Sequence, residues 1–135
     1  MAAWLFKTEP STFSHADLVK EKTARWDGVR NATALIHLGQ VARGDTVVIY
    51  HTGNEKRAVG LATVVRAPYP DPALDDAKLV VVDLAAGRRF PAPVPLAAFR
   101  ADPLLAQTDL VRITRLSIVP LSAAHLARIR ELAGD

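Results

Sequence analysis

The segment Gly44–Val65, GDTVVIYHTGNEKRAVGLATVV, contains two β-strand patterns separated by a turn. Thr46–His51 is a β-branched and aromatic run typical of a strand, and Ala58–Arg66 is a second apolar run. Between them, Thr52–Glu55 has the small and polar residues of a turn. The segment therefore predicts a β-hairpin. Gly60, inside the second run, predicts a bulge or the close approach of another group.

The residues before this hairpin predict one strand and two short helices. Ala3–Phe6 is an apolar run with two aromatic residues, which favours a buried strand. Ser14 is a suitable N-cap for a helix that ends near Lys22. Asn31 is a suitable N-cap for a second helix, which Gly39 can terminate.

The residues that follow the hairpin alternate between strand patterns and proline-rich stretches. Three prolines within Pro68–Pro72 predict a rigid loop, because proline lacks the backbone donor and fixes φ. Lys78–Leu84 predicts a strand, and Ala85–Phe90 predicts a turn. The prolines at 91, 93 and 95 predict pairing at a sheet edge only, or no pairing at all.

The C-terminal third predicts one more strand and a longer helix. Leu96–Arg100 fits a single helical turn, and Leu110–Pro120 fits a strand. Ser122 is a suitable N-cap for a helix that Gly134 follows. Because strands outnumber helices and no strand–helix–strand alternation is present, we expect an α+β fold. Its antiparallel or mixed sheet would curl into a small barrel, in one domain over residues 1–135.

The composition narrows the class of protein further. Half of the 135 residues are hydrophobic, which is enough for one core of ordinary size. Cysteine is absent, so disulfides and thiolate metal sites are excluded, and the four histidines lack a spacing such as HExxH. We therefore expect no metal. The chain shows no signal peptide and no apolar run of membrane length, which favours the cytoplasm. A net charge of +3 permits nucleic-acid binding without requiring it.

Four short stretches place polar or aromatic residues where a plain core would contain aliphatic ones. They are WLFKTEP at Trp4–Pro10, WDGVRN at Trp26–Asn31, IYHTG at Ile49–Gly53 and RLS at Arg115–Ser117. If folding brings them together, they supply an aromatic face, neutral hydrogen-bonding groups, an imidazole and cations. This combination suits a flat heteroaromatic ligand, because a base offers a π face for stacking and an edge for hydrogen bonds.

Several of these residues also have a purely structural interpretation. Trp4, in an apolar strand, is more typical of a core than of a ligand contact. Helix capping alone explains Asn31. Lys7 and Glu9 alternate along the strand end, where they predict a salt bridge or, alternatively, an acid–base pair. His51 is not accompanied by a nucleophile or a carboxylate array, which favours a structural or ligand-facing role over that of a general base.

Five stretches follow one another in an order that matches a known family. They are WLFKTEP, WDGVRNATA, GDTVVIYHTGNEKRAVGLATVV, APYPDP and RLSIVPLS. Together they resemble the EVE domain, a member of the PUA-like superfamily, over nearly the whole chain. The resemblance implies a PUA-like mixed β pseudo-barrel with flanking short helices. It also implies a deep pocket for a modified base flipped out of DNA or RNA.

Residues from all four polar stretches are assigned to this pocket by the resemblance. They are Trp4, Lys7, Thr8, Glu9, Trp26, Asn31, Tyr50, His51, Thr52, Leu116 and Ser117. Basic residues that would form a phosphate-binding rim, if folded onto one face, are Arg25, Arg30, Lys56, Arg57 and Arg115. Two positions depart from the family pattern. Ala32 stands where a tyrosine or proline is frequent, and His125 stands where a tryptophan is common.

The leading functional hypothesis is a non-catalytic reader of methylated or hydroxymethylated bases, with the base stacked on Trp26. The expected partner is DNA, RNA or a free modified nucleoside, bound by a monomer without a cofactor or a membrane. On this hypothesis, Trp26→Ala weakens binding and leaves the fold intact. The alternative is a small hydrolase or nuclease in which Lys7, Glu9 and His51 transfer protons. A third possibility is an interaction module with a vestigial pocket, which predicts no oligonucleotide binding.

Overall fold

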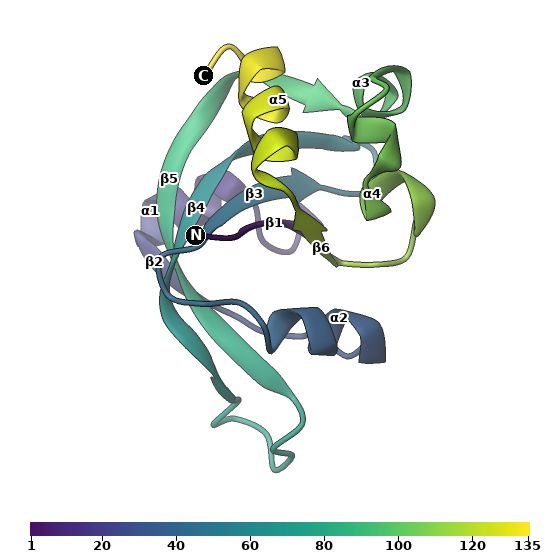
Figure 1. Ribbon diagram of the computed structural model, residues 1–135. Coiled ribbons are helices and arrows are strands. Elements are labelled where there is room, and N and C mark those ends of the chain that lie inside the picture. The colour runs from purple at the N-terminus through teal and green to yellow at the C-terminus, as the bar shows by residue number, and fades with distance from the viewer.

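The computed structural model describes residues 1–135 and shows a six-stranded mixed sheet flanked by short helices (Figure 1). The strands are β1 Ala3–Thr8, β2 Thr23–Trp26, β3 Thr46–His51, β4 Arg57–Pro70, β5 Val80–Pro95 and β6 Ile118–Leu121. The helices are α1 His15–Glu21, α2 Ala32–Leu38, α3 Leu96–Ala101, α4 Asp109–Arg112 and α5 Ala123–Ala133, with the 3₁₀ turn Leu105–Gln107. The predicted α+β class is confirmed. No helix has the length and apolar character needed to span a bilayer.

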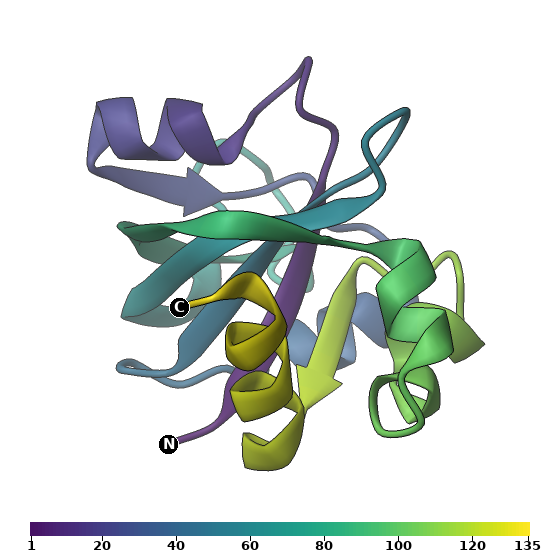
Figure 2. The same ribbon diagram turned by 90° about the horizontal axis from the view of Figure 1, so that it is seen from above.

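The sheet has the order β2-β5-β4-β3-β1-β6, which places β1 between β3 and β6. β1 runs parallel to β3, with Phe6 opposite Ile49, and antiparallel to β6, with Phe6 opposite Ile118. Leu5 and Phe6 are fully buried on opposite faces of β1, as expected for a strand covered on both sides. Seen from above, α1 and β2 lie on one side of the long strand β5, and α5 lies on the other (Figure 2).

The predicted helix starts are confirmed, and each uses the expected cap. The Ser14 side chain accepts from the Asp17 N–H, while the Asp17 carboxylate accepts from the Ser14 N–H. Asn31 Oδ1 accepts from the Ala34 N–H at 3.0 Å. At the start of α5, Ser122 forms a reciprocal pair with His125. These side chains satisfy backbone donors that a helix start leaves without an intrahelical partner.

The hairpin of β3 and β4 is confirmed, together with the bulge predicted at Gly60. The register shifts between Ile49, which pairs with Gly60, and Tyr50, which pairs with Ala58. A Cβ on Gly60 would lie 2.6 Å from the Cε1 and Nε2 atoms of His15. The absence of a side chain therefore lets the His15 ring pack directly on β4.

The predictions of a rigid loop at Pro68–Pro72 and of a turn at Ala85–Phe90 were wrong. β4 continues through Pro70 and β5 runs unbroken through Pro95, so the two form one long hairpin that projects from the body of the sheet (Figure 1). Beyond Thr63, β4 pairs with β5 alone. The prolines are accommodated because one side of each strand has no neighbour there and requires no backbone donor.

The strand predicted over Leu110–Pro120 is much shorter than expected. Asp109–Arg112 forms the helix α4, and only Ile118–Leu121 pairs with β1. The sequence also did not predict β2, a short and largely exposed strand whose order depends on antiparallel pairing with β5. Such elements are set by tertiary contacts, which override local preference.

We expect the free energy of unfolding to fall as the pH drops from about 7 to about 5, because of His15. Burial lowers the pKa of His15 below its ordinary value of 6.5, and the residue is only 2% exposed. Below about 6.5 the unfolded chain therefore takes up a proton that the folded protein disfavours, whereas above that pH this contribution to stability is fully present. Thermal melts across this window, repeated on His15→Gln, should show a weaker pH dependence in the variant. Equal slopes would contradict the prediction.

Candidate ligand-binding cavities

The structure distributes the predicted pocket residues among three separate cavities and the core. We name each cavity after one lining residue: the Trp26 cavity of about 550 Å³, the Lys7 cavity of about 270 Å³ and the His51 cavity of about 300 Å³. The first contains Trp26 and Thr8. The second contains Lys7, Tyr50, Thr52 and Lys56, and the third contains His51 and Arg57.

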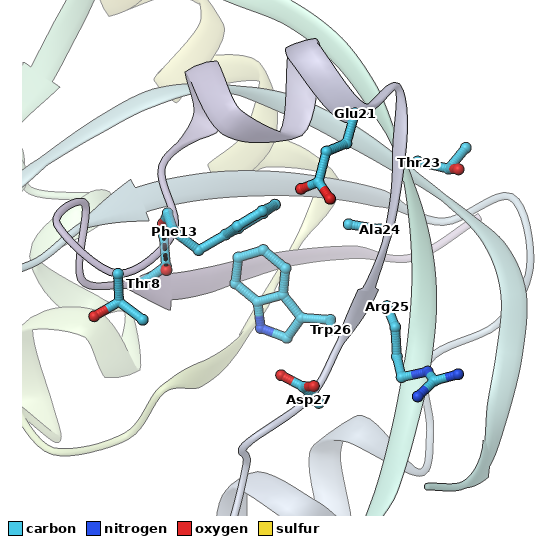
Figure 3. A pocket seen from close by; sticks show the side chains of 9 residues that line it. Thr8, Phe13, Glu21, Thr23, Ala24, Arg25, Trp26 and Asp27 are labelled. Atoms are coloured by element: carbon cyan, nitrogen blue, oxygen red, sulfur yellow. Dashed lines mark hydrogen bonds between the residues drawn. The ribbon is translucent and has the colours of Figure 1, made fainter. Parts of the chain in front are cut away.

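The Trp26 cavity lies between the strand β2, the end of β1 and the segment that leads into α1 (Figure 3). It is lined by Thr8, Thr12, Phe13, Glu21, Thr23, Ala24, Arg25, Trp26 and Asp27. The antiparallel pairing of Trp26 with Val82 fixes the position of the tryptophan at the end of β2. Gly28, with a φ of +79°, then turns the chain toward α2.

The Trp26 ring is largely covered by two neighbouring aromatic side chains. The residue is only 7% exposed, and two phenylalanines pack against it. The Phe6 centroid lies 5.7 Å away at 46°, and the Phe13 centroid lies 6.1 Å away at 80°. Figure 3 shows the indole nitrogen on the side of Asp27, away from Phe13. Most of the indole surface is therefore already in contact with the protein, and only a small part of it is open to a ligand.

The two tryptophans differ in the state of their indole N–H groups. Trp4 Nε1 donates to Asp45 Oδ2 at 3.0 Å inside the core. Trp26 Nε1 forms no hydrogen bond within the protein. Every fully buried side-chain nitrogen or oxygen has a hydrogen-bond partner, so Trp26 Nε1 must be partly exposed. The Trp26 N–H is therefore a donor accessible from the cavity, whereas the Trp4 N–H is not.

Carboxylates and one guanidinium set the electrostatics of the Trp26 cavity. Asp27 and Glu21 are exposed carboxylates at its rim, and both are hydrogen-bond acceptors when ionised. Arg25 is the cation of the lining, and its guanidinium lies 3.7 Å from Asp71. The Thr8 hydroxyl donates to the Phe13 carbonyl at 2.6 Å, which holds the segment before α1 close to β1. The cavity therefore combines an aromatic wall with two carboxylate acceptors and with the donors of the Trp26 indole and the Arg25 guanidinium.

The Lys7 cavity contains only basic charges. Its lining consists of Lys7, Tyr50, Thr52, Gly53, Lys56, Leu96, Arg100, Leu110 and Thr114. Lys7 and Tyr50 are register partners on the parallel pair of β1 and β3, so their side chains point to one face. Thr8, one residue further along β1, points to the other face and lines the Trp26 cavity.

His51 is held by hydrogen bonds on both ring nitrogens. Nε2 accepts from the His15 backbone N–H at 3.0 Å, and Nδ1 lies 2.9 Å from Glu55 Oε1. An Nε2 that accepts a backbone donor requires the neutral ring to carry its proton on Nδ1, from which it donates to Glu55. The lone pair that a general base would use is therefore already occupied. This arrangement agrees with the structural role considered for His51.

The remaining predicted residues do not line any of the three cavities. Trp4 and Leu116 are buried in the core, and the Asn31 side chain caps α2. The Ser117 carbonyl accepts from the Lys7 backbone N–H at 2.9 Å. Arg30 and Arg115 are exposed. The four polar stretches therefore meet around the end of β1 without forming a single concave site.

The predicted pairing of Lys7 with Glu9 was wrong. Lys7 Nζ donates to the Thr114 carbonyl at 2.8 Å, whereas the Glu9 carboxylate accepts from the Ser11 backbone and hydroxyl. The Ser11 donors lower the pKa of Glu9, which keeps it ionised. Glu9 lies beyond the end of β1, so strand alternation no longer applies to it. Lys7 and His51 line different cavities, and the geometry gives no common site for the proton transfer considered for Lys7, Glu9 and His51.

Sequence reasoning did not identify Phe13, Glu21 or Arg100 as cavity residues. Phe13 is the one large apolar residue in the polar stretch Ser11–Asp17, and this was a usable signal. Glu21 ends α1 and Arg100 lies in α3, where charged residues are ordinary. No local pattern in the sequence distinguishes these two from other exposed charges.

Comparison with known proteins reveals one family and several similar structures. The family model of the EVE domain matches residues 2–132. Mouse thymocyte nuclear protein 1 is 30% identical over an alignment of 154 residues that covers 88% of this chain and 68% of the mouse protein. A solution structure from Rhodopseudomonas palustris has 38% identity and a TM-score of 0.94, covering 99% of this chain and 94% of that chain. Human THYN1, solved in complex with DNA that contains 5-methylcytosine, has 28% identity and a TM-score of 0.89, covering 100% and 99%.

Proposed function

The chain belongs to the EVE domain family, as its motifs predicted, and from this premise we propose that it binds a modified base in nucleic acid without catalysing a reaction. The single observation that carries the proposal is the match, over the whole chain, to a protein solved with DNA containing 5-methylcytosine. The Trp26 cavity supports it, because that cavity combines aromatic side chains with hydrogen-bonding groups at the end of β2. We propose that the base enters this cavity.

A base must leave its duplex to reach such a site. Enzymes and readers that act on single bases rotate the nucleotide out of the stack at a cost of about a few kcal/mol. The Trp26 cavity, at about 550 Å³, lies within the range of about 300 to 1,000 Å³ that is usual for small-molecule sites. It therefore has room for a base and part of its sugar.

The polar groups of the cavity fit the edge of a cytosine. Its exocyclic amine is a donor that Asp and Glu side chains accept, and we assign this contact to Asp27, with Glu21 as the second acceptor. The Trp26 N–H, which has no partner in the protein, would donate to an acceptor on the same edge. Phe13 would contact the methyl or hydroxymethyl group, and Arg25 would pair with a flanking phosphate.

Discrimination between the modified and the unmodified base should be modest. One additional methyl group in an apolar niche is worth about 1 to 3 kcal/mol, which corresponds to roughly 10- to 200-fold in affinity. The strand itself would supply the rest of the binding energy through its phosphates, and that part falls as salt rises.

The proposal is tested by binding to matched DNA and RNA strands, with and without 5-methylcytosine or 5-hydroxymethylcytosine, at one fixed salt concentration. We expect a modified strand to bind more tightly, and Asp27→Asn to weaken it by about tenfold, since hydrogen bonds to charged groups contribute about 1.5 to 3 kcal/mol. Trp26→Phe removes the N–H and retains an aromatic ring, so it should also weaken binding.

Asp75→Asn is the matched control, because Asp75 is exposed in the β4–β5 connection and lines none of the cavities described. Its affinity should equal that of the unaltered protein. Equal binding of modified and unmodified strands by every protein would refute the function. Unchanged affinity for the modified strand in both Asp27→Asn and Trp26→Phe would place the base elsewhere.

A further inference from the structure

The Lys7 cavity collects positive charge that no carboxylate neutralises. Lys7, Lys56 and Arg100 line it, and none of its lining residues is acidic. None of these three side chains takes part in an ion pair, although Arg57, Arg88, Arg128 and Arg130 all do. Cations on an open surface are solvated and need no partner, but cations gathered around a cavity repel one another. The arrangement is therefore complementary to an anion.

Lys7 is the lining cation with the clearest unused capacity to bind an anion. Its side chain is half-buried, and Nζ has one protein acceptor, the Thr114 carbonyl at 2.8 Å. An ammonium group carries three donors, so two of them remain available. Burial lowers the pKa of Lys7, and a bound anion would oppose that effect by favouring the charged form.

Tyr50 adds a neutral donor at the same place. The residue is 3% exposed, lines the cavity, and its hydroxyl forms no hydrogen bond within the protein. Burial raises the pKa of Tyr50, so the phenol keeps its proton. The positive charge of Arg100 acts on this pKa in the opposite direction and is the smaller effect. Leu96 and Leu110 supply the aliphatic part of the lining.

We propose that the Lys7 cavity is a binding site for a phosphate group, held by Lys7, Lys56 and Arg100 with the Tyr50 hydroxyl. Phosphate oxygens accept several charge-assisted hydrogen bonds at once, which matches two ammonium groups and a guanidinium. At about 270 Å³ the cavity is larger than a phosphate alone, and Leu96 and Leu110 would contact the organic part of the ligand.

This site is distinct from the Trp26 cavity. The two share no lining residue, and the adjacent residues Lys7 and Thr8 point to opposite faces of β1. The phosphate belongs either to a bound nucleic-acid strand or to a free phosphorylated compound. Only the first source rests on the proposed function.

The site is tested first with small probes at constant ionic strength. Inorganic phosphate and adenosine 5′-monophosphate should bind saturably, as measured by calorimetry or by chemical-shift changes near Lys7 and Tyr50, whereas adenosine should bind at least about tenfold more weakly. Arg100→Gln and Lys56→Gln, both at exposed positions, should weaken phosphate binding by about tenfold. Arg43→Gln and Lys78→Gln, exposed and outside this cavity, serve as matched controls and should bind as before. No saturable binding of phosphate, or equal loss in the controls, overturns the proposal.

A second measurement identifies the source of the phosphate. If a strand phosphate occupies the site, Arg100→Gln should weaken modified and unmodified strands equally and leave their ratio unchanged. For this variant, the slope of log affinity against log salt concentration should also be shallower by about 0.7 to 0.9. That is the change expected for the loss of one phosphate contact. If phosphate binds and strand affinity is unaltered in the variants, the ligand is a free phosphorylated compound. Asp27→Asn tests the other cavity, because it should weaken strand binding and leave phosphate binding unchanged, so the two proposals fail independently.

Discussion

Replacing Asp45 by alanine should lower the free energy of unfolding by about 3 kcal/mol or more. Asp45 is 2% exposed, and its carboxylate accepts from the backbone N–H groups of Ala2 at 3.1 Å and Ala42 at 2.8 Å, and from the Trp4 indole at 3.0 Å. A buried donor left without a partner costs about 1 to 3 kcal/mol. Because Asp45→Ala leaves three donors without this acceptor, it should be among the most destabilising single substitutions in the chain.

The measurement is urea or thermal unfolding, in which a loss of this size lowers Tm by about 10 °C. Asp75→Ala is the control, since Asp75 is exposed and its loss should change stability by less than about 0.5 kcal/mol. The double variant with Trp4→Phe isolates the indole contact. Its loss of unfolding free energy should be smaller than the sum of the losses in the two single variants. Full additivity would mean that the Trp4–Asp45 bond contributes little.

Trp26→Ala should destabilise the fold by about 3 to 5 kcal/mol, in addition to weakening binding. The sequence suggested that this variant would leave the fold intact, but the residue is 7% exposed and packs against Phe6 and Phe13. Alanine leaves a cavity in that aromatic cluster, and neighbouring rings rarely collapse to fill such a space. Weak binding by Trp26→Ala would therefore not by itself identify a ligand contact.

Chemical unfolding of Trp26→Ala and Trp26→Phe side by side separates packing from recognition. Phenylalanine keeps most of the contacts with Phe6 and Phe13, so its loss of stability should be well under half that of alanine. The two variants should nevertheless share the loss of the N–H contact to the ligand. A Trp26→Ala protein as stable as the unaltered chain would contradict the packing described above.

Elements with strong local signals were predicted well from the sequence. The hairpin around Thr52–Glu55, the caps Ser14, Asn31 and Ser122, and the bulge at Gly60 all depend on residues close together in the chain. The long strands β4 and β5 were not predicted, because prolines normally interrupt pairing. They are tolerated here only because these strands lose their second neighbours, which is a property of the sheet and not of any local segment.

The candidate site was predicted in part for a similar reason. The family motifs mark Trp26 and Lys7 as notable, and each lines a cavity. Strand alternation, however, sends neighbouring residues of one motif to opposite faces, so Lys7 and Thr8 cannot share a pocket. Asn31 was correctly identified as a cap, and its Oδ1 is used within the protein. The single motif WLFKTEP thus contributes side chains to two cavities on opposite faces of β1.

The position of β1 between β3 and β6 also governs how the chain acquires its structure during synthesis. Ala3 pairs with Thr46 on one side and with Leu121 on the other, so β1 can complete its pairing only after both of these residues have been synthesised. Until Ile118–Leu121 has left the ribosome, the apolar strand β1 presents an unpaired edge, the kind of surface on which nascent chains associate wrongly. We therefore expect truncation before β6 to yield insoluble protein, even though every residue of the Trp26 cavity would still be present.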